Sequence, residues 1–300
     1  MTEIMPEQVD NIIHKMTGSD VAVPGTRIDY NGGLKLYCDA KNQEQLNEFL
    51  DGLRPKLVVL VGFAGYGKST FIGSLYHLLT KNLSYGGYNL VDSETYVGFE
   101  RRVFLRRVNS YNTTDTKRTV LGENDILHLK LRSDNGRYHD ILVSDKSGEI
   151  YSKYISSDED IETDIVLENA DMVVFFVDAE EESGKLVNHN LIVEKYESLL
   201  TRLMAQNKFA EGIPYVMVYT KIDKVHSEEQ KRKLEERKDK ICDVFVRIIG
   251  YKAESVYEVD STDLENDQLN DLFGEILHPR VRGEEQNNLD WVRIEIENEK

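Results

Sequence analysis

The sequence is poor in cysteine, which excludes a disulfide framework and a cysteine-based metal site. Its 300 residues include only Cys38 and Cys242, which lie far apart and show no CxxC spacing. Such a pattern is typical of reduced thiols in a cytosolic protein. The seven histidines are scattered without HxxxH spacing, so we assign no metal to them.

Long apolar runs are also lacking. No run approaches the roughly 18 apolar residues that a membrane-spanning helix needs. The first ten residues, MTEIMPEQVD, have neither the basic start nor the apolar stretch of a secretory signal. We therefore expect a cytoplasmic protein without a membrane partner.

Basic residues are outnumbered: 37 Lys and Arg stand against 54 Asp and Glu, for a formal net charge of −17. A chain this acidic is repelled by polyphosphate backbones, so we expect no nucleic-acid partner. The content of hydrophobic residues is 40%, which is enough for a sizeable core.

The chain divides into three parts by pattern. Residues 1–54 form an N-terminal extension, with a short helix near Glu7–Met16, a possible hairpin turning at Asn31–Gly33, and a helix over Asn42–Arg54. Residues 55–279 form the main domain, and 280–300 are a mostly polar tail.

The main domain alternates six expected strands with helices. Its run DMVVFFVD is continuously apolar, as in a parallel strand buried on both faces. The alternation predicts an α/β fold with a mostly parallel sheet and helices on both faces. The expected strands are Lys56–Val61, Asp125–Arg132, Tyr138–Ser144, Asp171–Asp178, Tyr215–Tyr219 and Ser255–Val259. The expected helices are Lys68–Leu79, Leu186–Met204, Ser227–Ile249 with a capping box, and Leu269–Leu277.

A phosphate-binding motif follows the first of these strands. The segment GFAGYGKS, residues 62–69, fits G-x-x-x-x-G-K-[ST] and lies between a strand and a helix. Its backbone N–H groups would surround the phosphates, Lys68 would reach the β- and γ-phosphates, and Ser69 would bind Mg²⁺. This predicts a P-loop NTPase. The expected phosphate-binding residues are Gly62, Gly65, Tyr66, Gly67, Lys68, Ser69 and Thr70.

Two later motifs bear on the choice of nucleotide. Asp145-Lys-Ser-Gly148 ends a strand, where Asp145 can reach Mg²⁺ through water and Gly148 can offer its N–H to a γ-phosphate. Thr220-Lys221-Ile222-Asp223 follows another strand. Asp223 can accept hydrogen bonds from N1–H and the exocyclic amine of guanine, whereas adenine would leave this carboxylate unpaired. The stem of Lys221 would cover the ring.

With these motifs the chain resembles the TRAFAC class of P-loop GTPases over roughly residues 56–279, and within it the bacterial double-GTPase-like group. The narrower resemblance rests on GFERRVFLRR from Gly98, KRT from Lys117, and the strand-end DKSGE. It implies a Ras-like G domain that takes GTP or GDP with Mg²⁺, and Ser261 as a residue beside the base. It further implies a bacterial cytosolic role, in a conflict or defence system beside separately encoded effectors.

Such GTPases carry one threonine in a loop before the second strand. Thr113, Thr114 and Thr116 compete with Thr119, which we choose because it is nearest the strand and matches the family's Arg-Thr pair. Thr119 would sense Mg²⁺ and the γ-phosphate, and Arg118 beside it is a candidate catalytic arginine.

The sequence departs from the common pattern in two places. The segment between Lys68 and Asp145 is longer than a minimal GTPase needs, and its Tyr96–Val108 stretch carries four arginines. These could bind a partner, supply a catalytic arginine in cis, or simply face solvent. Glu149 stands where many GTPases of this class have a glutamine that orients the attacking water, and its charge predicts slow intrinsic hydrolysis.

The acidic run Ser156–Asp164 lacks EF-hand spacing and is expected to cap a helix.

Three functions remain open: a GTP-dependent switch for a protein effector, which we prefer; an ATP-driven machine, against which the segment Thr220–Asp223 (TKID) argues; and a nucleotide-binding scaffold without hydrolysis, which Glu149 favours.

Overall fold

A computed structural model describes the backbone of residues 27–29 and 33–35 and, more fully, residues 39–43, 45–47, 50, 55–82, 84–103 and 126–278. The helix expected near Glu7–Met16 and the tail 280–300 lie outside these residues. β1 (Arg27–Asp29) and β2 (Gly33–Lys35) pair antiparallel, as a hairpin requires, and Gly33, which was expected in the turn, instead begins β2.

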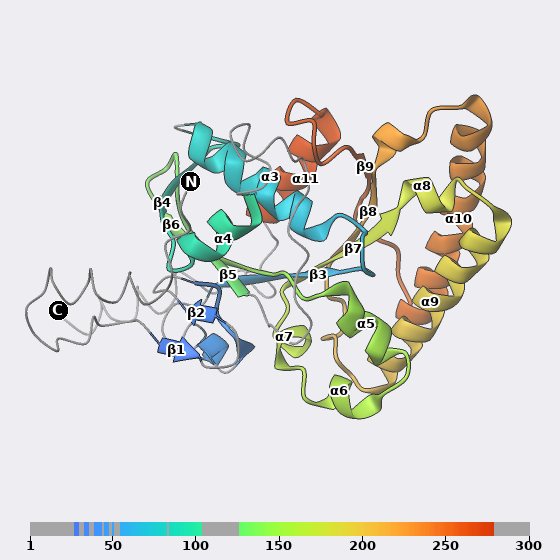
Figure 1. The fold of residues 1–300 in the computed structure, drawn as a ribbon, viewed down its shortest axis with the longest axis horizontal. Coiled ribbons are helices and arrows are strands. Elements are labelled where there is room, and N and C mark those ends of the chain that lie inside the picture. Colours follow the sequence, from blue (N-terminus) through green and yellow to red (C-terminus); the bar gives the residue numbers. More distant parts are fainter. Residues whose placement is uncertain are drawn as a thin grey trace, which may run out of the picture.

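The main domain is built on one sheet in the order β4-β5-β6-β3-β7-β8-β9 (Figure 1). From β6 to β9 all neighbours run parallel. β5 is antiparallel to both its neighbours, β4 and β6. The strands are β3 (Lys56–Val61), β4 (Tyr88–Asp92), β5 (Ile126–Ser133), β6 (Tyr138–Ser144), β7 (Met172–Asp178), β8 (Tyr215–Thr220) and β9 (Val256–Val259).

This sheet corrects the expected number of strands, because β4 adds a seventh at its edge. Only Leu90 and Val91 of β4 are aliphatic, and the end of the strand is exposed. An edge strand without an apolar run carries little sequence signal. β4 and the following helix α4 supply part of the long segment that separates Lys68 from Asp145.

Helices cover both faces of the sheet, as predicted. α3, α4 and α11 lie together on one side, and α5, α9 and α10 on the other (Figure 1). The helices that the structure describes in this domain are α3 (Lys68–Lys81), α4 (Tyr96–Val103), α5 (Gly148–Tyr154), α6 (Asp158–Glu162), α7 (Ile165–Glu168), α8 (Ala179–Glu182), α9 (Leu186–Ala205), α10 (Glu228–Ile249) and α11 (Asp267–Leu277), with the 3₁₀ turn η2 (Ile222–Lys224).

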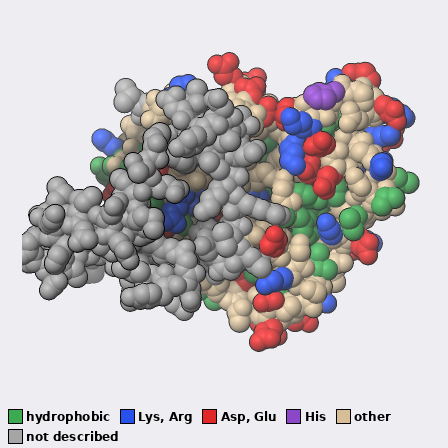
Figure 2. Space-filling model, in the orientation of Figure 1, with side chains coloured by type: hydrophobic (Ala, Val, Ile, Leu, Met, Phe, Trp, Pro, Cys, Tyr) green, Lys and Arg blue, Asp and Glu red, His purple; other side chains and the backbone are tan. Residues whose placement is uncertain are grey.

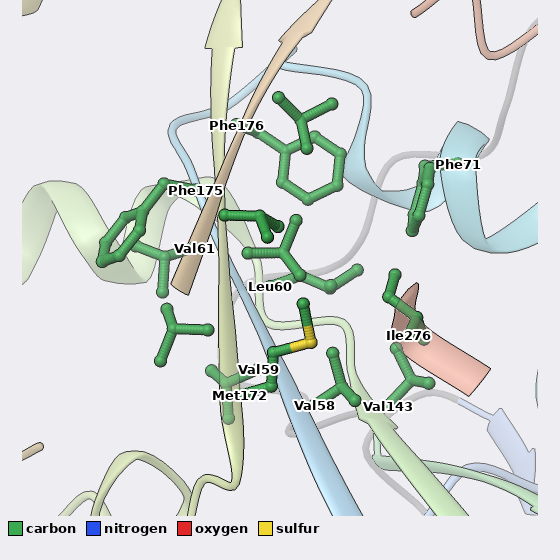
Figure 3. Packing of buried hydrophobic residues seen from close by; sticks show 14 of the residues in the cluster. Val58, Val59, Leu60, Val61, Phe71, Val143, Met172, Phe175, Phe176 and Ile276 are labelled. Atoms are coloured by element: carbon green, nitrogen blue, oxygen red, sulfur yellow. The ribbon is translucent and has the colours of Figure 1, made fainter. Parts of the chain in front are cut away.

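The core is centred on β3 and β7, whose middle residues are buried between the two helical layers (Figure 3). Phe71 of α3 packs on Phe176 of β7 and on Phe273 of α11, with ring centroids 5.3 and 4.8 Å apart. Apolar burial of this kind is the main stabilising term in folding. It also fixes the start of α3, and hence the loop before it, against the sheet.

Helix starts follow the local sequence. Ser227 and Gln230 form the predicted capping box of α10. In the acidic run, Ser157 caps α6 and Asp164 caps α7, which confirms the capping role expected of that run. Asp164 is buried rather than solvated, because Lys146 pairs with it and Tyr154 donates a hydrogen bond to it at 2.6 Å.

Acidic and basic side chains are interspersed on the visible described surface, with no continuous basic face (Figure 2). Within the described part of the chain, no helix combines the length and the hydropathy that a bilayer crossing requires. The same residues contain no cluster of three or more His, Cys, Asp or Glu side chains suited to a metal ion.

Candidate nucleotide-binding site

The G-x-x-x-x-G-K-S segment forms the turn between β3 and α3. Gly67 adopts φ +83° and is the N-cap residue of α3, a left-handed conformation that L side chains rarely adopt. Gly65 has φ +84°, and Gly62 lies against Phe176 of β7. Tyr66 is buried, with its hydroxyl 3.3 Å from a carboxylate oxygen of Glu181. Thr70 is half-buried in the first turn of α3, whose positive end faces this turn.

Lys68 folds back onto its own loop. Its Nζ donates to the carbonyl oxygens of Gly62 and Phe63 at 2.5 and 3.3 Å and lies 5.7 Å from the ring centroid of Tyr151. Burial lowers the pKa of Lys68 to about 8, and the negative charge of Asp145 opposes this shift. The loop thus holds an ammonium group away from water, where an anion would stabilise it.

This buried ammonium predicts a pH effect on stability. Between about pH 8 and the ordinary lysine pKa, the unfolded chain binds the proton that the folded chain has lost, so stability rises with pH. In the absence of nucleotide, the free energy of unfolding of wild type should increase relative to that of Lys68→Met by up to about 1.4 kcal/mol for each pH unit across this window. Urea unfolding of both proteins at pH 7 and above pH 9 measures the difference; a pH-independent difference would contradict the buried charge.

Ser69 and Asp145 meet across the site. The Ser69 hydroxyl lies 3.0 and 3.1 Å from the two carboxylate oxygens of Asp145, which directly follows β6 and is fully buried. The hydroxyl at this position of a P-loop can bind Mg²⁺, and a carboxylate beside it can hold the ion through one of the waters that Mg²⁺ usually keeps. The donor set therefore fits the ion that the sequence predicts here.

Arg102 also reaches this carboxylate. From α4 its Nε lies 2.6 Å from Oδ2 of Asp145, and its Nη1 donates to the carbonyl of Gly98 at 2.8 Å. Both charged side chains are buried. The sequence singled out the arginines of this stretch without indicating which one enters the site. Of the others, Arg101 is partly exposed and pairs with Asp39 at 2.7 Å, while Arg106 and Arg107 lie outside the described residues.

Because residue 148 is a glycine, the D-x-x-G segment can pack directly against the phosphate loop. A Cβ at position 148 would lie 2.1 Å from the backbone nitrogen of Ala64, far inside van der Waals contact. Ser147 caps the helix that Gly148 begins, accepting a hydrogen bond from the N–H of Glu149 at 3.4 Å. Glu149 itself is half-buried in the first turn of α5, next to the loop.

The TKID segment begins at Thr220, the last residue of β8, which is separated from β3 by β7 in the sheet. Thr220 donates from its hydroxyl to the carbonyl oxygens of Tyr66 and Val177 at 3.0 and 3.3 Å, which joins β8 to the phosphate loop. Lys221 adopts φ +58°, an uncommon conformation for a residue with a side chain. Its Nζ lies 2.5 Å from Asp178, and Asp223 is exposed, 3.2 Å from Lys224.

Two further residues follow or end neighbouring strands of the sheet: Ser261, which the sequence indicated, and Asp178, which it did not. Ser261, the expected residue beside the base, is buried after β9, and its carbonyl accepts a hydrogen bond from Ser74 of α3. Asp178, which sequence reasoning missed, caps α8 and holds Lys221. The sequence did contain an indication of this contact. Asp178 and Thr220 end adjacent parallel strands, so the residue after Thr220 must lie near Asp178. Thr119 and Arg118 lie outside the described residues.

A glycine-rich loop between a buried strand and a helix, with a strand-end aspartate beside it, defines an α/β P-loop NTPase fold. The model of the Double-GTPase 2 family matches residues 56–273. This chain belongs to the Double-GTPase 2 family, and its main domain is therefore a GTPase family domain. The predicted resemblance to the double-GTPase-like group is confirmed.

Among solved structures, a signal recognition particle receptor SRb-GTP/SRX complex from Chaetomium thermophilum is similar to this chain, with 15% sequence identity and a TM-score of 0.44. The similarity covers 75% of this chain and 99% of that one. No curated protein matches the chain significantly.

Proposed function

We propose that this protein binds GTP with Mg²⁺, hydrolyses it slowly to GDP and phosphate, and acts as a nucleotide-dependent switch for a protein partner. The observation that carries this proposal is the contact of the D-x-x-G segment with the phosphate loop, at Ser69–Asp145 and at Gly148–Ala64. A segment seated on this loop must respond when a γ-phosphate enters it.

Each group has a role in this proposal. Lys68 exchanges loop carbonyls for phosphate oxygens, Gly148 offers its N–H to the γ-phosphate, and Ser69 and Asp145 hold the ion. Bound Mg²⁺ would neutralise charge on the phosphates. Lys221 covers the guanine ring and Asp223 binds its N1–H and amine edge, with Ser261 beside it. We assign the remaining contact of the switch to Thr119, with Arg118 as a candidate catalytic group.

The proposal is tested by phosphate release from GTP with Mg²⁺ under single-turnover conditions. Wild type should release phosphate slowly, and Lys68→Met should release none above background. Absence of release from wild type, with GTP demonstrably bound, would favour the scaffold that binds without hydrolysis. ATP hydrolysed as fast as GTP would favour the ATP-driven machine.

Glu149 supplies a prediction about rate. Glu149 is half-buried and directly follows Gly148, which packs on the phosphate loop, and its negative charge would oppose the charge spread over the transferring phosphoryl group. Glu149→Gln keeps the shape, removes the charge, and should raise single-turnover hydrolysis several-fold. Glu159→Gln, an exposed change in α6, is the charge-matched control. Slower hydrolysis in Glu149→Gln would make the glutamate a proton acceptor, and an unchanged rate in Glu149→Ala would exclude a role for its side chain.

The partner of the switch is a protein in this proposal. The mixed charge of the described surface and the net charge of −17 disfavour nucleic acid. The family analogy favours a separately encoded effector in a bacterial conflict or defence system.

A further inference from the structure

The contact between Arg102 and Asp145 has no place in the proposed cycle so far. Asp145 is the carboxylate on which the proposed metal site depends, and a guanidinium already lies 2.6 Å from its Oδ2. The side chains are 9% and 0% exposed. A buried carboxylate requires a counter-charge, since an unpaired buried charge is strongly destabilising.

Resting on the proposed function, we propose that Arg102 is the counter-cation of Asp145 in the protein without nucleotide, and that Mg²⁺ binding with nucleotide must displace it. Arg102 and the ion then compete for one buried carboxylate. α4, which lies in the long segment between Lys68 and Asp145, consequently responds to whether the metal site is filled. Arg102 also determines the Mg²⁺ concentration at which the site fills.

α4 packs on α3, so that displacement of Arg102 can change the contacts of other parts of the domain. Phe99 stacks on Tyr76 of α3 with ring centroids 4.6 Å apart, and the Tyr76 hydroxyl donates to Glu100 at 3.1 Å. These contacts fix α4 to the helix that begins at the phosphate loop. Arg102 is therefore held within reach of Asp145 by the same helix that carries Ser69.

α4 also meets the N-terminal extension. A Cβ on Gly98 would lie 2.8 Å from the backbone nitrogen of Ala40, and Arg101 pairs with Asp39. α4 is followed directly in sequence by the segment that holds Thr119. Release of Arg102 would thus alter an element that touches the extension and leads into the expected switch loop.

The test is the Mg²⁺ dependence of thermal unfolding at fixed GDP, in wild type and Arg102→Met. If Arg102 holds Asp145 in at least nine-tenths of the molecules, removing it lowers the half-saturating Mg²⁺ concentration at least about tenfold. Arg101→Met, which removes an equal charge one residue away and leaves Asp145 untouched, should behave as wild type. The same titrations without nucleotide should show a larger Mg²⁺-induced rise for Arg102→Met than for wild type.

Equal Mg²⁺ dependence in wild type and Arg102→Met, in both series, would overturn the competition. If that equality came with about a thousandfold loss of hydrolysis at saturating Mg²⁺, Arg102 would instead be a transition-state arginine. Failure of the proposed function looks different: guanine nucleotide would not stabilise wild type at all, whatever the Mg²⁺ series showed.

A second measurement uses the unmodified protein and does not depend on the variant folding. Hydrogen exchange of the backbone amides of α4 is compared without ligand and with Mg²⁺ and GDP. Loss of the Arg102 anchor should speed exchange over Tyr96–Val103 while α3 becomes slower. Slower exchange in α4 on adding ligand would contradict the displacement.

Discussion

Asp223→Asn should bind GDP at least about a hundredfold more weakly than wild type and should gain affinity for xanthine nucleotides. Asp223 is exposed two residues after Lys221, just beyond the end of β8, and the proposed function assigns it to the edge of the base. Two hydrogen bonds to a carboxylate contribute about 1.5–3 kcal/mol each, and 1.4 kcal/mol is tenfold in affinity.

The gain on xanthine follows from donor and acceptor geometry. Guanine presents two donors to Asp223, whereas xanthine replaces the exocyclic amine by a carbonyl oxygen. Asparagine offers one acceptor and one donor and so matches xanthine. Asp239→Asn, an exposed carboxylate on α10, makes the same charge change elsewhere and should leave GDP affinity unchanged. Unaltered base preference in Asp223→Asn would mean that TKID is a surface turn, and the ATP-driven machine would then become the better account.

Gly148→Ala should weaken binding of a non-hydrolysable GTP analogue by about tenfold to a hundredfold while affecting GDP much less. The added Cβ would meet the backbone of Ala64 at 2.1 Å, so the D-x-x-G segment must move off the phosphate loop. The Gly148 N–H then loses its hydrogen bond to the γ-phosphate, a bond to a charged group of about 1.5–3 kcal/mol. GDP lacks that phosphate.

Gly274→Ala is the matched control for this substitution. Gly274 lies inside α11 with no atom within 4 Å of an added Cβ, so alanine there should stabilise the helix by up to about 1 kcal/mol. Calorimetric titration of both variants with GDP and with the GTP analogue separates a switch defect from a general loss of stability. Equal loss for the two nucleotides in Gly148→Ala would remove γ-phosphate sensing from this glycine.

The sequence predicted the elements whose local pattern determines them. Tyr138–Ser144 was predicted with the bounds that the structure shows, and DMVVFFVD proved to be the buried parallel strand β7. The phosphate loop and the strand-end aspartate were found because their chemistry requires particular residues at particular spacings.

What the sequence could not show depends on tertiary contacts. Arg101 and Arg102 are neighbours with the same chemistry, yet one pairs near the surface with Asp39 and the other is buried on Asp145. About 100° of helical rotation separates them, and only the packing of α4 against α3 decides which faces inward. β4 went unpredicted because its position is set by pairing with β5.

The central claim is that this chain is a guanine-nucleotide switch. It is tested most directly by thermal unfolding of the wild-type protein with Mg²⁺, comparing GDP and a non-hydrolysable GTP analogue with the matching adenine nucleotides. A ligand that binds only the folded state raises the midpoint by mass action. Only the guanine nucleotides should raise the unfolding midpoint; an equal rise with adenine nucleotides would contradict a guanine-nucleotide switch.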